Sequence, residues 1–241
     1  MIRRVILAAL LAGIAAGIFM SAIQEVRITP LIIEAEKYEA PEVDSKVTTS
    51  ELSTAEQPSG TVTPAAESEP WGPSNGLERT LYTTSASVVT GAGFAVLLAG
   101  LSLLTGIPIT PRNGIIWGLC GFIAITLAPS AGLPPALPGV PAGDLAFRQI
   151  WWLATVLATG LGLYLIATAR SLWPIAAAIA VIAAPHFISL PEPADPTSAV
   201  PPILAAVYVS NVLAAAAIFW SLTGVFLGLA MKRFAKEIYA T

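Results

Sequence analysis

The residues of this sequence that could bind a metal ion lie near one end of its predicted helices. A histidine together with carboxylates is a reasonable ligand set for a borderline divalent cation such as Co²⁺ or Ni²⁺, and six-coordination leaves room for water or for a partner's ligands. The candidate metal ligands are Glu25, Glu34, Glu36, Asp144, His186 and Asn211. Their chemistry predicts a metal site at this end of the molecule.

Each candidate ligand also has an ordinary structural interpretation. The single histidine, His186, fits a hydrogen-bonded residue at a membrane interface, and the glutamates of the set fit a solvated face. Asp144 could cap a helix and pair along it with Arg148, four residues later. Asn211 could join two helices through a hydrogen bond. The sequence leaves both interpretations open.

The remaining reactive side chains exclude several other functions. One histidine and one cysteine, Cys120, cannot supply a nucleophile, a base and an orienting group, so we expect no enzyme and no tightly bound cofactor. No ionisable residue lies near the middle of a predicted span, which argues against a self-contained proton-coupled pump. No basic patch with interleaved aromatic residues is present, so nucleic-acid binding has no support.

The helices that must position these side chains are predicted to cross a membrane. Only 11% of the 241 residues are charged, against about 25% in soluble domains, and the mean hydropathy is +0.75. A membrane-spanning helix needs about 20 apolar residues. Six stretches meet this requirement: 5–23, 81–109, 114–131, 150–169, 172–190 and 203–231. The sequence therefore predicts a single all-α membrane domain, a polytopic bundle of about six spans.

Two features of this count have alternatives. Only Arg170 and Ser171 separate the fourth span from the fifth, so five spans would result if the fifth lay partly in the membrane interface. The first span also has features of a secretory signal peptide. Because its apolar region is as long as a membrane span, we expect a retained helix.

The flanking charges predict that both termini are cytoplasmic. With this orientation seven Lys and Arg residues lie inside, and the five outside are spread over longer segments. Fourteen of the fifteen Asp and Glu residues fall outside. Residues 40–78 are rich in Pro, Ser, Thr and Glu and cannot bury enough apolar surface to offset the entropy of ordering. They are predicted to form a mobile, acidic extracytoplasmic loop.

Paired glycines four residues apart occur in three of the predicted spans. The pairs are Gly13/Gly17, Gly114/Gly118 and Gly224/Gly228. Small residues allow helix backbones to approach closely in lipid. The pairs predict either ordinary helix contacts within one bundle or a face reserved for a partner protein.

An ordered series of short motifs resembles the CbtA family of predicted cobalt transporter subunits. The series covers nearly the whole chain apart from 40–78. It consists of Arg3–Gly17, Gln24-Glu25-Val26, Thr29–Glu39, Leu127-Ala128-Pro129, Gly132–Pro135, Pro138-Gly139, Arg148–Trp152, Pro185-His186 and the helix from Asn211 to Trp220. The family is usually described with about five spans, against the six predicted here.

This resemblance implies a function and a partner. It implies cobalt uptake linked to cobalamin synthesis, in a bacterial or archaeal cytoplasmic (inner) membrane. It also implies a small B-type subunit with one span and a histidine-rich terminus, which would supply nitrogen ligands that this chain lacks. The leading hypothesis is a membrane subunit of a divalent metal uptake system, with Co²⁺ as the transported cation. The alternative is a non-transporting accessory or scaffold subunit of a larger membrane complex.

Overall fold

The computed structural model describes residues 2–38, 73–74, 76–190, 193 and 197–235. These residues form helices joined by turns and loops, and they contain no strand. The elements are α1 (Ile2–Ile23), η1 (Gln24–Ile28), α2 (Thr29–Glu36), α4 (Leu77–Thr105), α5 (Gly114–Phe122), η2 (Ile123–Leu127), α6 (Ala128–Ser130), α7 (Leu145–Thr168), α8 (Leu172–Ala183), η3 (Ala184–Phe187) and α9 (Pro202–Ala235). The predicted all-α membrane bundle is confirmed.

Within the described ranges these elements join into six helical segments, and each predicted span falls on one of them. Four segments are long and apolar enough to cross a membrane: Ile2–Glu36, Leu77–Thr105, Leu145–Thr168 and Pro202–Phe234. The other two, Gly114–Ser130 and Leu172–Phe187, are apolar but shorter. At 1.5 Å per residue the first of these two extends about 26 Å, slightly less than a typical hydrocarbon core of about 30 Å.

The first helix runs well beyond the predicted span. The span was predicted to end at residue 23, whereas the helix continues through η1 and α2 to Glu36. η1 is a single wide π-helical turn, and Pro30 follows it in the first turn of α2. Because proline lacks an N–H and crowds the preceding turn, a local widening lets the helix continue past it.

The same arrangement recurs in the third segment. The π-helical turn η2 ends at Leu127, and Pro129 follows in the first turn of α6. In both segments the π-helical turn is therefore followed by one further residue and then by a proline. Such turns are rare and occur frequently at functional sites.

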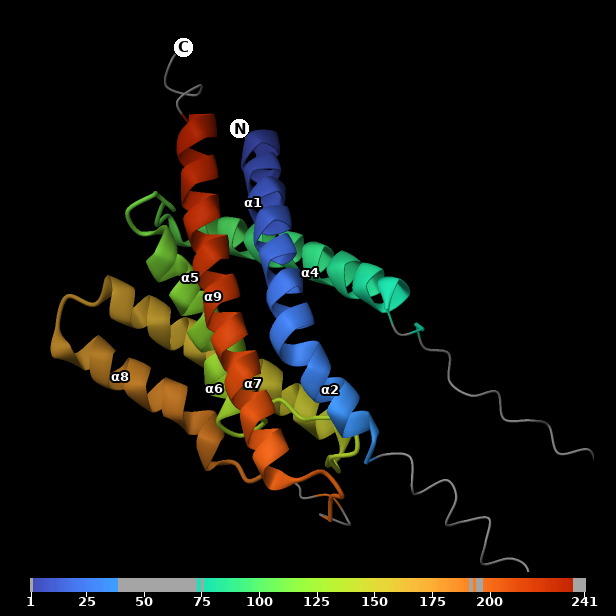
Figure 1. Ribbon diagram of the computed structural model, residues 1–241. Coiled ribbons are helices and arrows are strands. Elements are labelled where there is room, and N and C mark those ends of the chain that lie inside the picture. The colour runs from blue at the N-terminus through green and yellow to red at the C-terminus, as the bar shows by residue number, and fades with distance from the viewer. Residues whose placement is uncertain (1, 39–72, 75, 191–192, 194–196, 236–241) are drawn as a thin grey trace, which may run out of the picture.

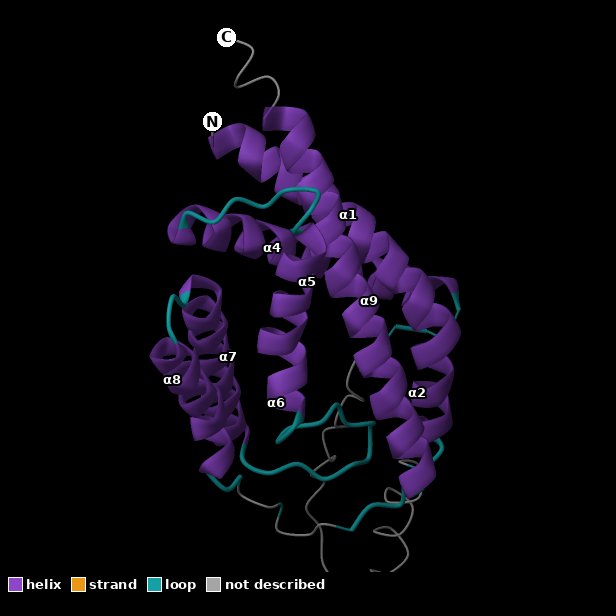
Figure 2. Cartoon of the chain, turned by 90° about the vertical axis from the view of Figure 1, so that its left-hand side faces the viewer, coloured by secondary structure: helices purple, strands orange, loops and turns teal. Residues whose placement is uncertain are grey.

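α9 lies at the centre of the bundle, between α1 on one side and α5 on the other. α4 packs against α1 and is steeply inclined to both α1 and α9 (Figure 1). α7 and α8 form an antiparallel hairpin, and α7 joins it to η2 and α6 (Figure 2). The hairpin corresponds to the fourth and fifth predicted spans, and its turn contains Arg170 and Ser171.

The glycine pairs mark the closest helix contacts inside this bundle. A Cβ on Gly13 would overlap the Gly91 carbonyl oxygen on α4, and one on Gly17 would meet the Ser87 carbonyl oxygen. A Cβ on Gly114 would likewise overlap the carbonyl oxygen of Gly224, where α5 meets α9. Gly228, the second glycine of the third pair, lies against the Thr110 carbonyl oxygen in the same way. All three pairs therefore form helix contacts within the chain. The structure favours helix contacts in one bundle over a face reserved for a partner.

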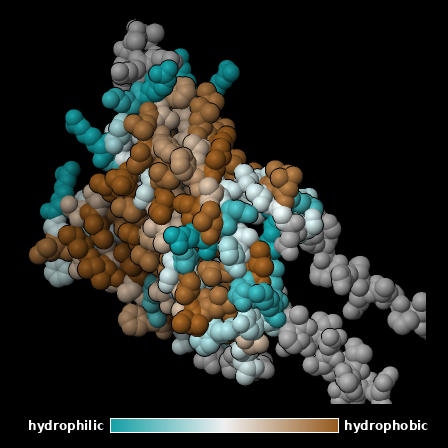
Figure 3. Space-filling model, in the orientation of Figure 1, coloured by the Kyte–Doolittle hydropathy of each residue, from teal (hydrophilic) through white to brown (hydrophobic). Residues whose placement is uncertain are grey.

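Aromatic side chains of α4 and α9 fill the space beside these contacts. Trp220 is 2% exposed and lies against Phe94, with ring centroids 4.7 Å apart. Its indole Nε1 donates to Thr126 Oγ1 in η2 at 3.2 Å. The outer faces of the helices carry large exposed apolar residues. Figure 3 shows apolar side chains over most of the central part of one face, as expected of a surface solvated by lipid.

The two described ends of the chain lie together. The beginning of α1 and the end of α9 share one end of the bundle, and α2, α6 and the beginning of α9 lie toward the other (Figures 1 and 2). Most of the predicted 40–78 loop lies outside the described residues. Its last residues are already helical, since α4 begins at Leu77. Which side of the membrane each end of the bundle faces stays a prediction.

Candidate functional site

A row of polar contacts joins the first helix to α4. The close approach at Gly13, Gly17 and Gly91 brings small hydroxyl side chains within reach of one another. In order along the first helix, the contacts are Ser21 Oγ with Thr84 Oγ1 at 2.6 Å, Ser87 Oγ to Gln24 Oε1 at 2.7 Å, Thr80 Oγ1 to Glu25 Oε1 at 3.2 Å, and Arg79 Nη2 to Glu36 Oε1 at 2.7 Å. We call this row the α1–α4 polar seam.

The hydroxyl residues of the seam are absent from the sequence-based candidates. Thr80, Thr84 and Ser87 are spaced i, i+4, i+7 and therefore share one face of a helix. This spacing could have identified a polar face on that helix. It could not have shown that Gln24 and Glu25 of the first helix lie opposite that face.

The three candidate glutamates of the first helix have different surroundings. Glu34 Oε2 accepts a hydrogen bond from Lys37 Nζ at 2.6 Å, and this bond raises the pKa of Lys37. Glu36 forms the ion pair with Arg79 across to α4. Glu25 is exposed, and its contact is the bond from the Thr80 hydroxyl. Among the described residues, Glu25 is thus the candidate glutamate that no cation neutralises, since both salt bridges near it involve Glu34 and Glu36.

His186 lies at the end of the α7–α8 hairpin, in η3. Its Nδ1 is 3.2 Å from the Ile182 carbonyl oxygen, and its Nε2 is 3.1 Å from the Ala128 carbonyl oxygen in α6. The ring stacks edge-on against Trp151, whose Nε1 donates to the Pro185 carbonyl oxygen at 2.9 Å. Both ring nitrogens therefore face backbone carbonyls, and His186 ties the hairpin to α6.

Asp144 and Asn211 also make local contacts. Asp144 is the N-cap of α7, and its carboxylate accepts a hydrogen bond from the Phe147 N–H at 2.8 Å. The alternative helix-cap role suggested by the sequence is therefore present. The side chain of Asn211 donates to the Val207 carbonyl oxygen at 2.8 Å, one turn earlier on the same helix.

The candidate ligands share one end of the bundle but do not converge on a point. In the part of the chain that the structure describes, no three His, Cys, Asp or Glu side chains are close enough to hold a metal ion together. Glu25, Glu34 and Glu36 follow one helix, whereas Asp144 and His186 belong to the hairpin. Their role as metal ligands stays a prediction.

The sequence comparisons identify one family. The family model described as "Probable cobalt transporter subunit (CbtA)" matches residues 2–232, which is nearly the whole chain. No curated protein and no solved structure matches the chain.

Proposed function

Because the chain belongs to the CbtA family of probable cobalt transporter subunits, we propose that it is the membrane subunit of an uptake system for a divalent transition metal, with Co²⁺ as the cargo. The family match over residues 2–232 carries this proposal. Four helices with the length and composition of membrane spans support it. We place the protein in a bacterial or archaeal cytoplasmic membrane.

The acidic end of the first helix supports a role in attracting the cation. Glu25, Glu34 and Glu36 follow one another on η1 and α2, toward the end of the bundle away from the described chain ends. Fixed negative charge at the mouth of a path raises the local concentration of cations. Since Lys37 and Arg79 neutralise two of these carboxylates, Glu25 is the residue on which this attraction depends most.

A second chain would complete the coordination. Cobalt favours imidazole ligands alongside oxygen ligands. This chain has a single histidine, and both of its ring nitrogens face backbone carbonyls. The family description names a subunit, which implies partners. We propose a small single-span, histidine-rich subunit that supplies the nitrogen ligands while this chain supplies the path and the acidic approach.

Reconstitution tests this proposal directly. The full chain would be placed in liposomes that contain a cobalt-quenched dye, with and without the small histidine-rich subunit. We expect Co²⁺ influx when both are present. Glu25→Gln should raise the cobalt concentration for half-maximal influx about threefold, because it removes one charge at the approach. Glu78→Gln, an exposed acid at the start of α4 bonded to Ser74, serves as the matched control.

An accessory or scaffold subunit is the second candidate function. It is favoured by the lack of a three-ligand cluster among the described residues. Absence of cobalt influx from the reconstituted pair, together with co-purification of the chain in a larger membrane complex, would replace the transport proposal with this one.

A further inference from the structure

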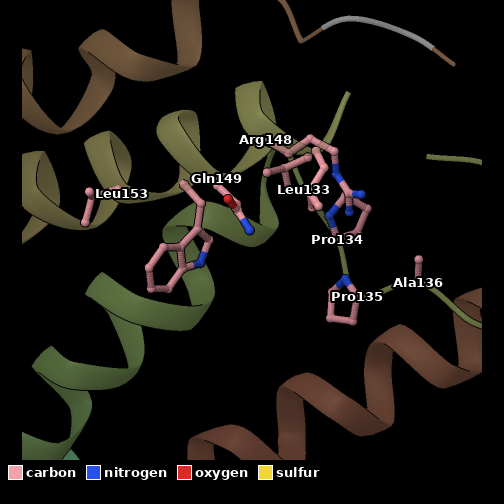
Figure 4. Close-up of a pocket in the computed structure, with 9 residues that line it drawn as sticks. Leu133, Pro134, Pro135, Ala136, Arg148, Gln149 and Leu153 are labelled. Carbon is pink, nitrogen blue, oxygen red and sulfur yellow. The ribbon is translucent and has the colours of Figure 1, made fainter. Parts of the chain in front are cut away.

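A cavity of about 550 Å³ lies at the beginning of α7, away from the polar seam. One wall is the segment 133–136, which carries two consecutive prolines. The opposite wall is the first turns of α7, with Arg148, Gln149, Trp152 and Leu153 (Figure 4). The volume lies within the usual range for sites that bind small molecules, roughly 300–1,000 Å³.

The polar side chains of this cavity form no hydrogen bond or ion pair within the described chain. Arg148 is half-buried, and no described carboxylate lies within 4.0 Å of its guanidinium group. Figure 4 shows its side chain extending along Leu133 and Pro134, on the cavity side of α7. Asp144, the nearest acid in sequence, instead caps the helix through the Phe147 N–H. A guanidinium group in apolar surroundings without an anion is unfavourable unless a ligand supplies one.

The walls indicate which kind of anion would fit. Apart from Arg148, Gln149 and the indole of Trp152, the lining residues are apolar. The cavity is also continuous with a lipid-exposed surface, because Ile150, Leu153 and Leu157 are exposed along α7. A small free anion would use the guanidinium group but leave this apolar surface unused. An amphiphile with a phosphate and an acyl chain would use both.

We propose that this cavity binds an anionic phospholipid, with the headgroup phosphate on Arg148 and an acyl chain along the outer face of α7. Arg forms paired hydrogen bonds with phosphate oxygens, and Gln149 provides an additional amide donor next to it. Trp152 lies beside the headgroup, the level at which tryptophan is enriched in membrane proteins. The bound lipid holds the 133–136 segment against α7 and thereby fixes the start of the α7–α8 hairpin.

Native mass spectrometry of the detergent-purified full chain tests this site. Phosphatidylglycerol and phosphatidylcholine with identical acyl chains would be titrated separately, and glycerol phosphate would be added as the headgroup without chains. We expect the chain to bind one molecule of phosphatidylglycerol, and to bind it more tightly than phosphatidylcholine. Arg148→Gln should weaken its binding about tenfold, the usual consequence of losing a charge-assisted hydrogen bond. Arg170→Gln, in the exposed turn at the other end of α7, is the matched control and should bind as the unaltered chain does.

Several outcomes would overturn the proposal. These are equal binding of the two lipids, unchanged binding by Arg148→Gln, and displacement of the lipid by glycerol phosphate at equal concentration, which would identify a free-anion site. Recovery of an acidic protein in place of lipid, lost in Arg148→Gln, would identify a protein interface instead. Should Arg148→Gln not fold, Arg148→Lys keeps the charge and should weaken binding to an intermediate degree. Lipid binding is measured without cobalt, so failure of this proposal can be distinguished from failure of the transport proposal.

Discussion

His186 is held by two backbone carbonyl groups, one in its own hairpin and one in α6. A neutral imidazole has one N–H and donates to one of these oxygens, whereas an imidazolium donates to both. In either state both ring nitrogens are directed at protein atoms. This geometry makes the histidine a tie between α8 and α6, and a metal ion would have to displace one of these contacts to reach it.

Substitution of His186 separates the structural role from the ligand role. His186→Ala removes the tie to Ala128 and the contact with Trp151, so we expect it to lower the free energy of unfolding by about 0.5–1.5 kcal/mol, the usual range for a hydrogen bond of an exposed side chain. Thermal unfolding in detergent would measure this, and cobalt uptake would be normalised to folded protein. Unchanged uptake per folded molecule is the expected result. Reduced uptake with unchanged stability would instead support the ligand role predicted from the sequence.

Asp144 offers a second test at the level of one side chain. Asp144→Ala removes the acceptor for the Phe147 N–H and should destabilise the protein by about 1 kcal/mol, whereas Asp144→Asn retains a good N-cap and should have little effect. Unfolding of the two variants in parallel measures the difference. If Asp144 contributed charge to a metal path, Asp144→Asn would reduce cobalt uptake despite its normal stability.

Some contacts of these residues could be predicted from the sequence, and others could not. The N-cap at Asp144 could be predicted because a cap depends on neighbours three residues away in the chain. The contact between His186 and Ala128 joins positions 58 residues apart and depends on the hairpin docking against α6, which no local pattern specifies. The pairing of Glu36 with Arg79 is similarly non-local, because the two positions are 43 residues apart in the chain.

At the level of elements, apolar runs located every helical segment, but not every boundary. Gly106 has φ of +69° and ends α4 at Thr105, four residues before the predicted end of that span. The span was predicted from its apolar residues, which continue to residue 109. The turn at Gly106 depends on the backbone conformation and was therefore missed. The π-turns before Pro30 and Pro129 were also not predictable, because proline alone predicts a helix end or a kink equally well.

The crossing of α1 and α4 provides a test with a control on the same helix. Gly91→Ala would place a methyl group against the Gly13 carbonyl oxygen, and because backbone atoms cannot move aside, the helices must separate. We expect a loss of about 1–3 kcal/mol of stability. Gly93→Ala lies two residues away with nothing within 4 Å of its Cβ, and its higher helix propensity should leave stability unchanged or slightly increased. Equal effects of the two substitutions on thermal unfolding would contradict the close packing of α1 against α4.

At the scale of the whole molecule, the two shorter segments determine the topology. The segment Leu172–Phe187 contains twelve α-helical residues and a four-residue 3₁₀ turn, so it extends about 26 Å. A bilayer can thin to match such a helix at modest cost. If this segment crosses the membrane, both ends of the chain share one side. If it does not, five spans would put the end of α9 on the side opposite the start of α1, although the two share one end of the bundle (Figure 1).

Cysteine labelling distinguishes these two topologies. In a Cys120→Ala background, Lys37→Cys, Ser171→Cys and Arg233→Cys place single thiols at exposed sites at the end of α2, in the hairpin turn and near the end of α9. A membrane-impermeant maleimide added to intact cells should label position 37 alone. Positions 171 and 233 should react only after permeabilisation, because Arg170 and Lys232, which both variants retain, favour the cytoplasmic side. Labelling of position 233 in intact cells, with 171 still protected, would mean that α8 lies in the interface and that the bundle has five spans. Labelling of 171 and protection of 37 would reverse the whole orientation and place the acidic approach at Glu25 on the wrong side for uptake.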